Sequence, residues 1–387
     1  MENISLNSRQ SKPHIVWLDV VRFVAMFTVV CCHSADPFNF YSGNVTADSE
    51  NIKFWGAIYG AFLRPCVPLF VMITGALLLP VCGETSVFYR KRISRVLWPF
   101  LIWSVLYNIF PYVTKLLGCS PDVVLACFPY ADADVMSRSL GVSLKSIAEI
   151  PLNFSAIDGH MWYIYLLIGM YLYMPIFSAW VEKASEKAKG WFLLAWGVTL
   201  FVPYYRMFAD QYIWGSCSWN EFYMLYNFAG FNGYLLLGHY LRHHDWSLSK
   251  VLAYGIPMFA VGYAVTFFGF RYMTASPDCT AEEYELFLYY CSPNVVMMTI
   301  PVFLLLKKVK VTNQRLQNAL ANLTICGFGV YMIHFFLTGS GIVLARYCHI
   351  PVPLQILFSA VIAFFVSWLL VIGLRKLFGK SARYIVG

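Results

Sequence analysis

The first apolar run of the sequence carries four ionisable side chains whose types and spacing suit proton transfer. They lie in the segment WLDVVRFVAMFTVVCCHSADPF and are Asp19, Arg22, His33 and Asp36. Arg22 and His33 are eleven residues apart, close to three helical turns, so they share one helix face. Each has a carboxylate one turn away. Because ionisable groups inside an apolar span are costly, these four are candidates for function.

The chemistry best suited to this group is base-assisted transfer. A neutral imidazole titrates near ambient pH, so we predict that His33 acts as a general base, with Asp36 or Asp158 orienting its ring. At about 1.5 Å per residue, Arg22 lies about 16 Å from His33 and cannot touch it. Two plainer interpretations stay open: Arg22 as an interfacial anchor paired with Asp19, and His33 as a packed, hydrogen-bonded residue.

A basic pair precedes the third apolar run. Arg92 and Arg95 are three residues apart in YRKRISRVLWPF, so both lie on one face where that helix begins. Guanidinium groups form paired hydrogen bonds with phosphate oxygens, which makes the pair a candidate site for a phosphorylated ligand. The alternative is that these charges only fix the orientation of the protein in the membrane.

More polar residues are predicted near the level of His33. His160 and Trp162 follow Asp158 and the longest connection, at the outer entrance of the fourth span. Tyr331 and His334 are one turn apart and are predicted to face the interior of the bundle. We treat all four as candidates for substrate binding, although hydrogen bonds between helices explain Tyr331 and His334 equally well.

Two further residues complete the candidate site. Arg64 is an interior charge in the outer half of the second apolar run, where it would pair with an acid or orient a substrate carbonyl group. Most tryptophans mark the membrane interfaces, but Trp103 is predicted to lie deep enough to line a cavity.

The elements that hold these residues follow from the composition. Of 387 residues, 59% are hydrophobic and only 12% are charged, against about 25% charged in soluble domains. The net charge of +8 lies in short loops beside the apolar runs, which indicates membrane topology and excludes a nucleic-acid surface. Apolar runs of about twenty residues favour helices over barrel strands. We therefore predict an all-α polytopic protein of the cell membrane, surrounded by the lipid bilayer.

About ten apolar runs are long enough to be transmembrane helices. Alternate connections carry most of the Lys and Arg residues, so both termini are predicted to be cytoplasmic and residues 118–159 to form an outer loop. The predicted organisation is a cytoplasmic segment 1–14, a membrane domain 15–374 and a cytoplasmic tail 375–387. The spans are placed near Ile15–Ala35, Trp55–Leu79, Val96–Leu117, Met161–Trp180, Trp191–Phe208, Phe222–Leu241, Val251–Phe270, Leu286–Leu306, Leu320–Leu344 and Leu354–Leu374.

The cysteines do not indicate a metal site. The eleven cysteines are scattered, without a CxxC pair or a Cys/His cluster at metal spacing, so no metal is predicted. A disulfide in the outer loops stays open, because spacing does not determine pairing. The cysteines in or near those loops are Cys119, Cys127, Cys217, Cys279 and Cys348.

The sequence resembles the acyltransferase-3 family of bacterial integral-membrane acyltransferases, which modify cell-surface glycans and related acceptors. Arg22, ten intervening residues and then His33 match the signature of that family, and Arg92 with Arg95 is similar to its RxxR pair. The resemblance continues in order through most of the membrane region. Its segments are VPLFVMITGALLL, RISRVLWPFLIWSVLY, HMWYIYLLIGMYLYMPIF, NGYLLLGHYL and GVYMIHFF.

The resemblance implies an O-acyltransferase that takes an acyl group, most often acetyl, from cytoplasmic acyl-CoA. Arg92 and Arg95 would hold the phosphates of coenzyme A, and the pantetheine arm would extend past Arg22 and Trp103 toward His33. The acceptor would be a hydroxyl of a glycan or lipid-linked glycan outside the cell. An acyl-histidine intermediate and direct transfer both stay open.

Two other functions fit part of the pattern. Buried Arg, His and Asp residues also mark proton-coupled transporters and flippases. Against that function, the sequence shows no internal repeat and no pair of broken helices in matching positions. A membrane sensor or assembly partner without turnover is a weaker possibility, because such a protein would not need the Arg22 and His33 pair.

Overall fold

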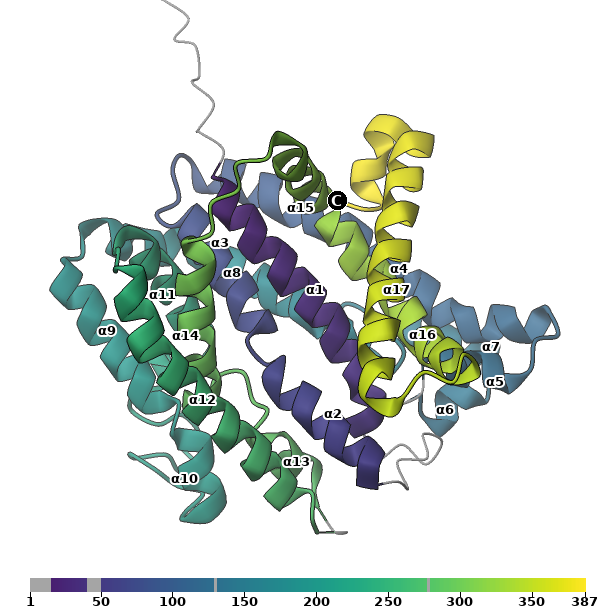
Figure 1. The fold of residues 1–387 in the computed structure, drawn as a ribbon, viewed down its shortest axis with the longest axis horizontal. Coiled ribbons are helices and arrows are strands. Elements are labelled where there is room, and N and C mark those ends of the chain that lie inside the picture. The colour runs from purple at the N-terminus through teal and green to yellow at the C-terminus, as the bar shows by residue number, and fades with distance from the viewer. Residues whose placement is uncertain (1–14, 40–49, 129–130, 277–278) are drawn as a thin grey trace, which may run out of the picture.

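The computed structural model describes residues 15–39, 50–128, 131–276 and 279–387, and these residues fold as helices and connecting loops (Figure 1). The predicted segment 1–14 lies outside the described residues. The helices in chain order are α1 Val16–Asn39, α2 Glu50–Phe62, α3 Cys66–Leu78, α4 Thr85–Leu116, α5 Pro121–Cys127, α6 Ala133–Met136, α7 Leu140–Glu149, η1 Gly159–Met161, α8 Trp162–Lys183, α9 Glu186–Thr199, α10 Val202–Phe208, η2 Tyr226–Phe228, α11 Asn232–His243, α12 Leu248–Met273, α13 Ala281–Leu286, α14 Pro293–Lys307, α15 Gln314–Ile333, α16 Phe335–Tyr347, α17 Val352–Phe378 and η3 Gly379–Tyr384.

The helices have the length and composition of membrane spans. Within the described ranges, seven helical segments are long and apolar enough to cross a bilayer, and α14 and α16 are shorter apolar helices. The prediction of an all-α polytopic membrane protein is therefore confirmed. The seven segments are Val16–Asn39, Glu50–Leu78, Thr85–Leu116, Gly159–Lys183, Leu248–Met273, Gln314–Ile333 and Val352–Tyr384.

The span predicted at Phe222–Leu241 differs from the structure. Only its second half is an α-helix, α11, which has 12 residues. Gly230 has a φ of 85°, a left-handed conformation that glycine adopts readily and that stops a helix from extending backward. The apolar residues before it therefore form a loop with the short turn η2. The predicted span Trp191–Phe208 is likewise divided, into α9 and α10.

Two predicted spans are interrupted beside the candidate site. The second span breaks into α2 and α3 around Arg64, just before Pro65, which has no backbone N–H to continue the helix. The ninth breaks into α15 and α16 at His334. There the imidazole Nδ1 lies 2.8 Å from the carbonyl oxygen of Tyr331, which in an unbroken helix would accept the N–H of Phe335. At both interruptions a polar side chain bonds a carbonyl oxygen of the preceding helix, Arg64 that of Gly60 and His334 that of Tyr331.

Helix α1 lies at the centre of the molecule and positions the site. It packs against α2, α3, α14, α15, α16 and α17, and it crosses the middle of Figure 1. Its buried face includes Val21, Ala25 and Val29, small or branched residues that allow close neighbours. Because α1 runs through the centre, it places Arg22 near one end of the molecule and His33 near the other. We refer to these as the Arg22 end and the His33 end.

Helix α11 is held against α3 by an unusually close backbone contact. A Cβ atom on Gly75 would stand 1.9 Å from the carbonyl oxygen of Leu235, and one on Gly238 would stand 2.0 Å from that of Met72. Any side chain at either glycine would collide with backbone. The short helix α11 is therefore fixed by its packing on α3 and not by its length.

The predicted topology can be tested by cysteine labelling. Ser137 is exposed after α6, on the His33 end, and native Cys82 is exposed between α3 and α4, on the Arg22 end. With Cys217 and Cys348 replaced by serine, we expect Ser137→Cys to react with a membrane-impermeant maleimide on intact cells. Cys82 should react only after permeabilisation. The reverse pattern would contradict cytoplasmic termini.

Candidate functional site

A cavity of about 580 Å³ surrounds the His33 end of α1, and we call it the His33 cavity. Five of the residues predicted from sequence line it, although they come from α1, the turn between α2 and α3, η1 and the start of α8. The fold therefore gathers side chains that are far apart in the chain. The five are His33, Asp36, Arg64, His160 and Trp162.

His33 is held by Asp36 in a single orientation. Its Nδ1 lies 2.9 Å from Oδ2 of Asp36, and the two side chains are 17% and 14% exposed. A carboxylate can only accept this hydrogen bond, so in the neutral imidazole Nδ1 carries the proton and Nε2 keeps a lone pair. This is the tautomer that a general base requires.

Two other imidazoles approach His33. The ring centroids of His334 and His160 lie 5.3 Å and 6.3 Å from that of His33. His160 stacks on Phe335 at 4.2 Å, and neither of its ring nitrogens has a hydrogen-bond partner among the described residues. His160 thus presents polar nitrogens beside the base. His334 is fully buried behind His33 and does not line the cavity.

Arg64 brings a buried positive charge to the same cavity. Its Nε donates to the carbonyl oxygen of Gly60 at 2.8 Å and its terminal nitrogen contacts Sγ of Cys32 at 3.1 Å. The guanidinium also lies 5.5 Å from the ring centre of Tyr290. Within the described part of the chain it forms no salt bridge, so its charge is available to an electron-rich group in the cavity.

Asp158 does not orient His33. Its Oδ1 accepts hydrogen bonds from the backbone N–H and the hydroxyl of Ser155, at 2.7 Å and 2.8 Å. Its Oδ2 accepts one from the amide of Asn108 at 3.2 Å. Burial raises the pKa of this carboxyl group. Oδ1 is thus committed to the turn that presents His160 and Oδ2 to α4. Of the two acids predicted to hold the base, only Asp36 contacts it.

A second cavity, of about 360 Å³, lies at the Arg22 end, and we call it the arginine cavity. It is lined by Arg22, Arg92 and Arg95 together with apolar residues of α3, α4, α8 and α15. Arg22 is paired with Asp19 at 3.2 Å. Arg92 and Arg95 form no salt bridge with any described residue. Like charges that share a cavity repel each other, so this arrangement favours a bound anion.

A hydrogen bond joins residues that line the two cavities. The hydroxyl of Tyr331 donates a hydrogen bond to the carbonyl oxygen of His160. Tyr331 lines the arginine cavity, whereas His160 lines the His33 cavity. The sequence placed both residues in one substrate site, but the structure places them on either side of a partition.

Trp103 lines neither cavity. Its Nε1 donates to the carbonyl oxygen of Ile385 at 2.8 Å, across 282 positions of the chain. This contact holds α4 against the C-terminal residues. Local sequence does not reveal a partner so far along the chain. The prediction that Trp103 lines a cavity with the donor-binding residues therefore differs from the structure.

Several residues of the His33 cavity were missed by sequence reasoning. Tyr290 stacks against Trp162, with ring centres 5.8 Å apart, and Glu285 lines the same wall. They belong to the segment EYELFLYYC, which we interpreted as the beginning of a span. Two adjacent tyrosines after an acidic stretch were the available signal of a polar cavity wall.

The eleven cysteines, all of them in the described ranges, are free thiols. No disulfide therefore constrains the loops at the His33 end. The connection from residue 118 to 159, predicted as one outer loop, instead contains the helices α5, α6 and α7.

Comparison with known proteins gives one match. A family model described as an acyltransferase domain, that of the acyltransferase-3 family, matches residues 15–372. No curated protein and no solved structure matches the chain. The matched range covers both cavities and nearly the whole chain, and so the protein belongs to the acyltransferase-3 family of membrane acyltransferases.

Proposed function

We propose that this protein transfers an acetyl group from cytoplasmic acetyl-CoA to a hydroxyl of a cell-surface glycan or related acceptor on the other side of the membrane. The observation that supports this most is the pair of cavities at opposite ends of α1. One cavity offers Arg92 and Arg95, which form no salt bridge with a described residue, and the other offers an oriented base. The hydrogen bond from Tyr331 to His160 joins residues that line the two cavities.

The arginine cavity would hold the donor. Coenzyme A carries a pyrophosphate and a 3′-phosphate, and two guanidinium groups that form no salt bridge with a described residue match such oxyanions. Arg92 and Arg95 would bind the phosphates, while the pantetheine arm passes Arg22 along apolar walls toward Tyr331. Displacement of the Tyr331 side chain would then admit the thioester to the His33 cavity.

The His33 cavity would carry out the transfer. Nε2 of His33 takes the proton of the acceptor hydroxyl as the oxygen attacks the thioester carbonyl carbon. Negative charge develops on the carbonyl oxygen, where Arg64 stabilises it. The carbon–sulfur bond then breaks, and the imidazolium returns the proton to the departing thiolate. The products are an ester and coenzyme A, and His33 is regenerated.

The direct test uses purified protein and acetyl-CoA labelled in the acetyl group. We expect the protein to bind acetyl-CoA and to release or transfer the labelled acetyl group at a rate above that of a boiled sample. If the folded protein neither binds nor consumes acetyl-CoA, the donor is wrong. A transport assay would then be the next experiment.

Asp36→Asn is predicted to slow turnover by about 10- to 100-fold. The loss corresponds to about 1.5–3 kcal/mol for a hydrogen bond to a charged group. The amide can no longer hold the base as a carboxylate does, whereas donor binding at the other cavity should be unchanged. Asp122→Asn is the matched control, because Asp122 is exposed in α5 and lines neither cavity. Equal turnover in both variants would show that Asp36 does not support the base.

A further inference from the structure

A third cavity adjoins the site and is polar. It has a volume of about 710 Å³ and lies among α8, α9, α10, η2 and the segment from α13 to α14, and we call it the polar cavity. Glu285 and Tyr289 line both this cavity and the His33 cavity. A molecule in the polar cavity can therefore reach toward the base across these two side chains.

The lining of the polar cavity suits a head group with several hydroxyls. Glu282 and Glu285 are exposed there, and their carboxylates form no hydrogen bond or salt bridge with the described residues. Arg206 lies 5.5 Å from the ring centre of Tyr223. Carboxylates accept hydrogen bonds from hydroxyls, guanidinium groups donate to ring and hydroxyl oxygens, and tyrosine faces pack against C–H groups.

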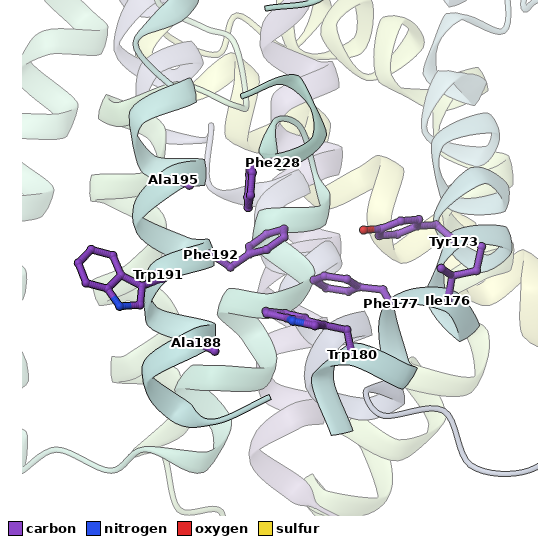
Figure 2. Close-up of a pocket in the computed structure, with 9 residues that line it drawn as sticks. All are labelled: Tyr173, Ile176, Phe177, Trp180, Ala188, Trp191, Phe192, Ala195 and Phe228. Carbon is purple, nitrogen blue, oxygen red and sulfur yellow. The ribbon is translucent and has the colours of Figure 1, made fainter. Parts of the chain in front are cut away.

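An apolar crevice lies beside the polar cavity. It has a volume of about 530 Å³ between α8 and α9, and Tyr173 lines both spaces. Figure 2 shows Phe177, Trp180 and Phe192 gathered in it, and neighbouring rings are 5.3–5.4 Å apart. We call this the aromatic crevice.

The mouth of the aromatic crevice lies at the surface of the helix bundle. At its mouth Ile176 is 70% exposed and Trp191 is 61% exposed, although both belong to helices of a membrane protein. In Figure 2 the Trp191 ring points away from the other aromatic side chains. The crevice is therefore accessible from the bilayer, while the cavity that it joins is polar.

We propose that the acceptor is lipid-linked, with its polyhydroxylated head in the polar cavity and its apolar chain in the aromatic crevice. This rests on the proposed function, because it concerns the acceptor of that reaction. Three connected spaces support it: the His33 cavity, the polar cavity and the aromatic crevice. A polar space joined to an apolar one matches an amphiphile better than a water-soluble glycan, which would leave the crevice unused.

The test uses alkyl glycosides that carry a photoreactive diazirine in the chain and a maltose or N-acetylglucosamine head. The protein is embedded in phosphatidylcholine nanodiscs without acyl donor, irradiated and digested, and labelled peptides are identified by mass spectrometry. We expect labelling at Phe177–Trp180 or Phe192. An alkyl glycoside without the diazirine should displace the photoreactive probe at least tenfold more effectively than the free sugar or added phosphatidylcholine does.

The decisive variant changes a residue of the polar cavity, and its effect is measured as labelling in the aromatic crevice. Arg206→Gln should reduce labelling in the aromatic crevice at least fivefold, although Arg206 does not line the crevice. Arg346→Gln is the matched control, since Arg346 is exposed on α16 and lines none of these spaces. The inference would be overturned by equal labelling of the two variants. It would also be overturned if phosphatidylcholine displaced the probe as well as the alkyl glycoside does, or if neither probe labelled the aromatic crevice.

Acetyl-CoA binding is measured in the same preparation. If binding is intact and the labelling result is negative, only the lipid-linked acceptor is excluded. If wild-type protein fails to bind acetyl-CoA, the proposed function itself is wrong, whatever the crevice binds.

Discussion

His33→Ala is expected to reduce acyl transfer by about 10²- to 10⁴-fold, the usual contribution of a positioned general base. The physical reason is the tautomer fixed by Asp36, which leaves Nε2 as the proton acceptor. Alanine removes this group, and no other imidazole in the described part of the chain is placed to replace it. His334 is buried outside the cavity, and His160 has no carboxylate partner among the described residues.

The measurement compares initial rates with acetyl-CoA binding in the same detergent preparation. Donor binding should stay at the wild-type level, because His33 lies at the opposite end of α1 from the arginine cavity. His244→Ala, outside both cavities, controls for loss of a histidine. Wild-type turnover in a folded His33→Ala protein would remove His33 from the mechanism.

The double variant Arg92→Gln with Arg95→Gln should weaken donor binding by about 1.5–3 kcal/mol for each lost charge-assisted contact. Together this amounts to about 10²- to 10⁴-fold in Kd. Wild-type binding should also weaken as salt concentration rises, because the phosphates and guanidinium groups attract each other electrostatically. If Arg92 and Arg95 bind the 3′-phosphate, wild type and variant should differ less in their affinity for desphospho-coenzyme A than in their affinity for coenzyme A.

The chain provides a matched control for the lost charge. Arg90 and Lys91 lie in the same basic segment and are exposed, but they do not line the arginine cavity. Arg90→Gln with Lys91→Gln removes the same charge near the same membrane surface, so any effect on topology is shared. Equal donor affinity in the two double variants would mean that Arg92 and Arg95 act only as anchors.

The parts of this protein that sequence predicts well are those set by local pattern. Apolar runs of span length predict the central helix, and helical geometry alone places Arg22 and His33 on one face. The spacing of three residues between His33 and Asp36 likewise predicts their contact, which the structure has at 2.9 Å. These relations need no knowledge of the rest of the chain.

Features set by tertiary contacts were beyond the same reasoning. Trp103 bonds Ile385 and therefore does not line the arginine cavity. Asp158 bonds Ser155 and Asn108 and therefore does not orient His33. The helix interruptions at Arg64 and His334 depend on a proline and on a side chain that competes for a backbone carbonyl. Apolar windows average over such single positions and therefore predict continuous helices.

The short helix α11 has a consequence for hydration within the bilayer. Twelve residues at about 1.5 Å each span about 18 Å, whereas the hydrocarbon layer is about 30 Å thick. The irregular segment that precedes α11 lines the polar cavity, and irregular backbone at membrane depth is tolerated where it lines a water-filled space. The polar cavity should therefore bring water to a depth that a longer helix would have filled with apolar side chains.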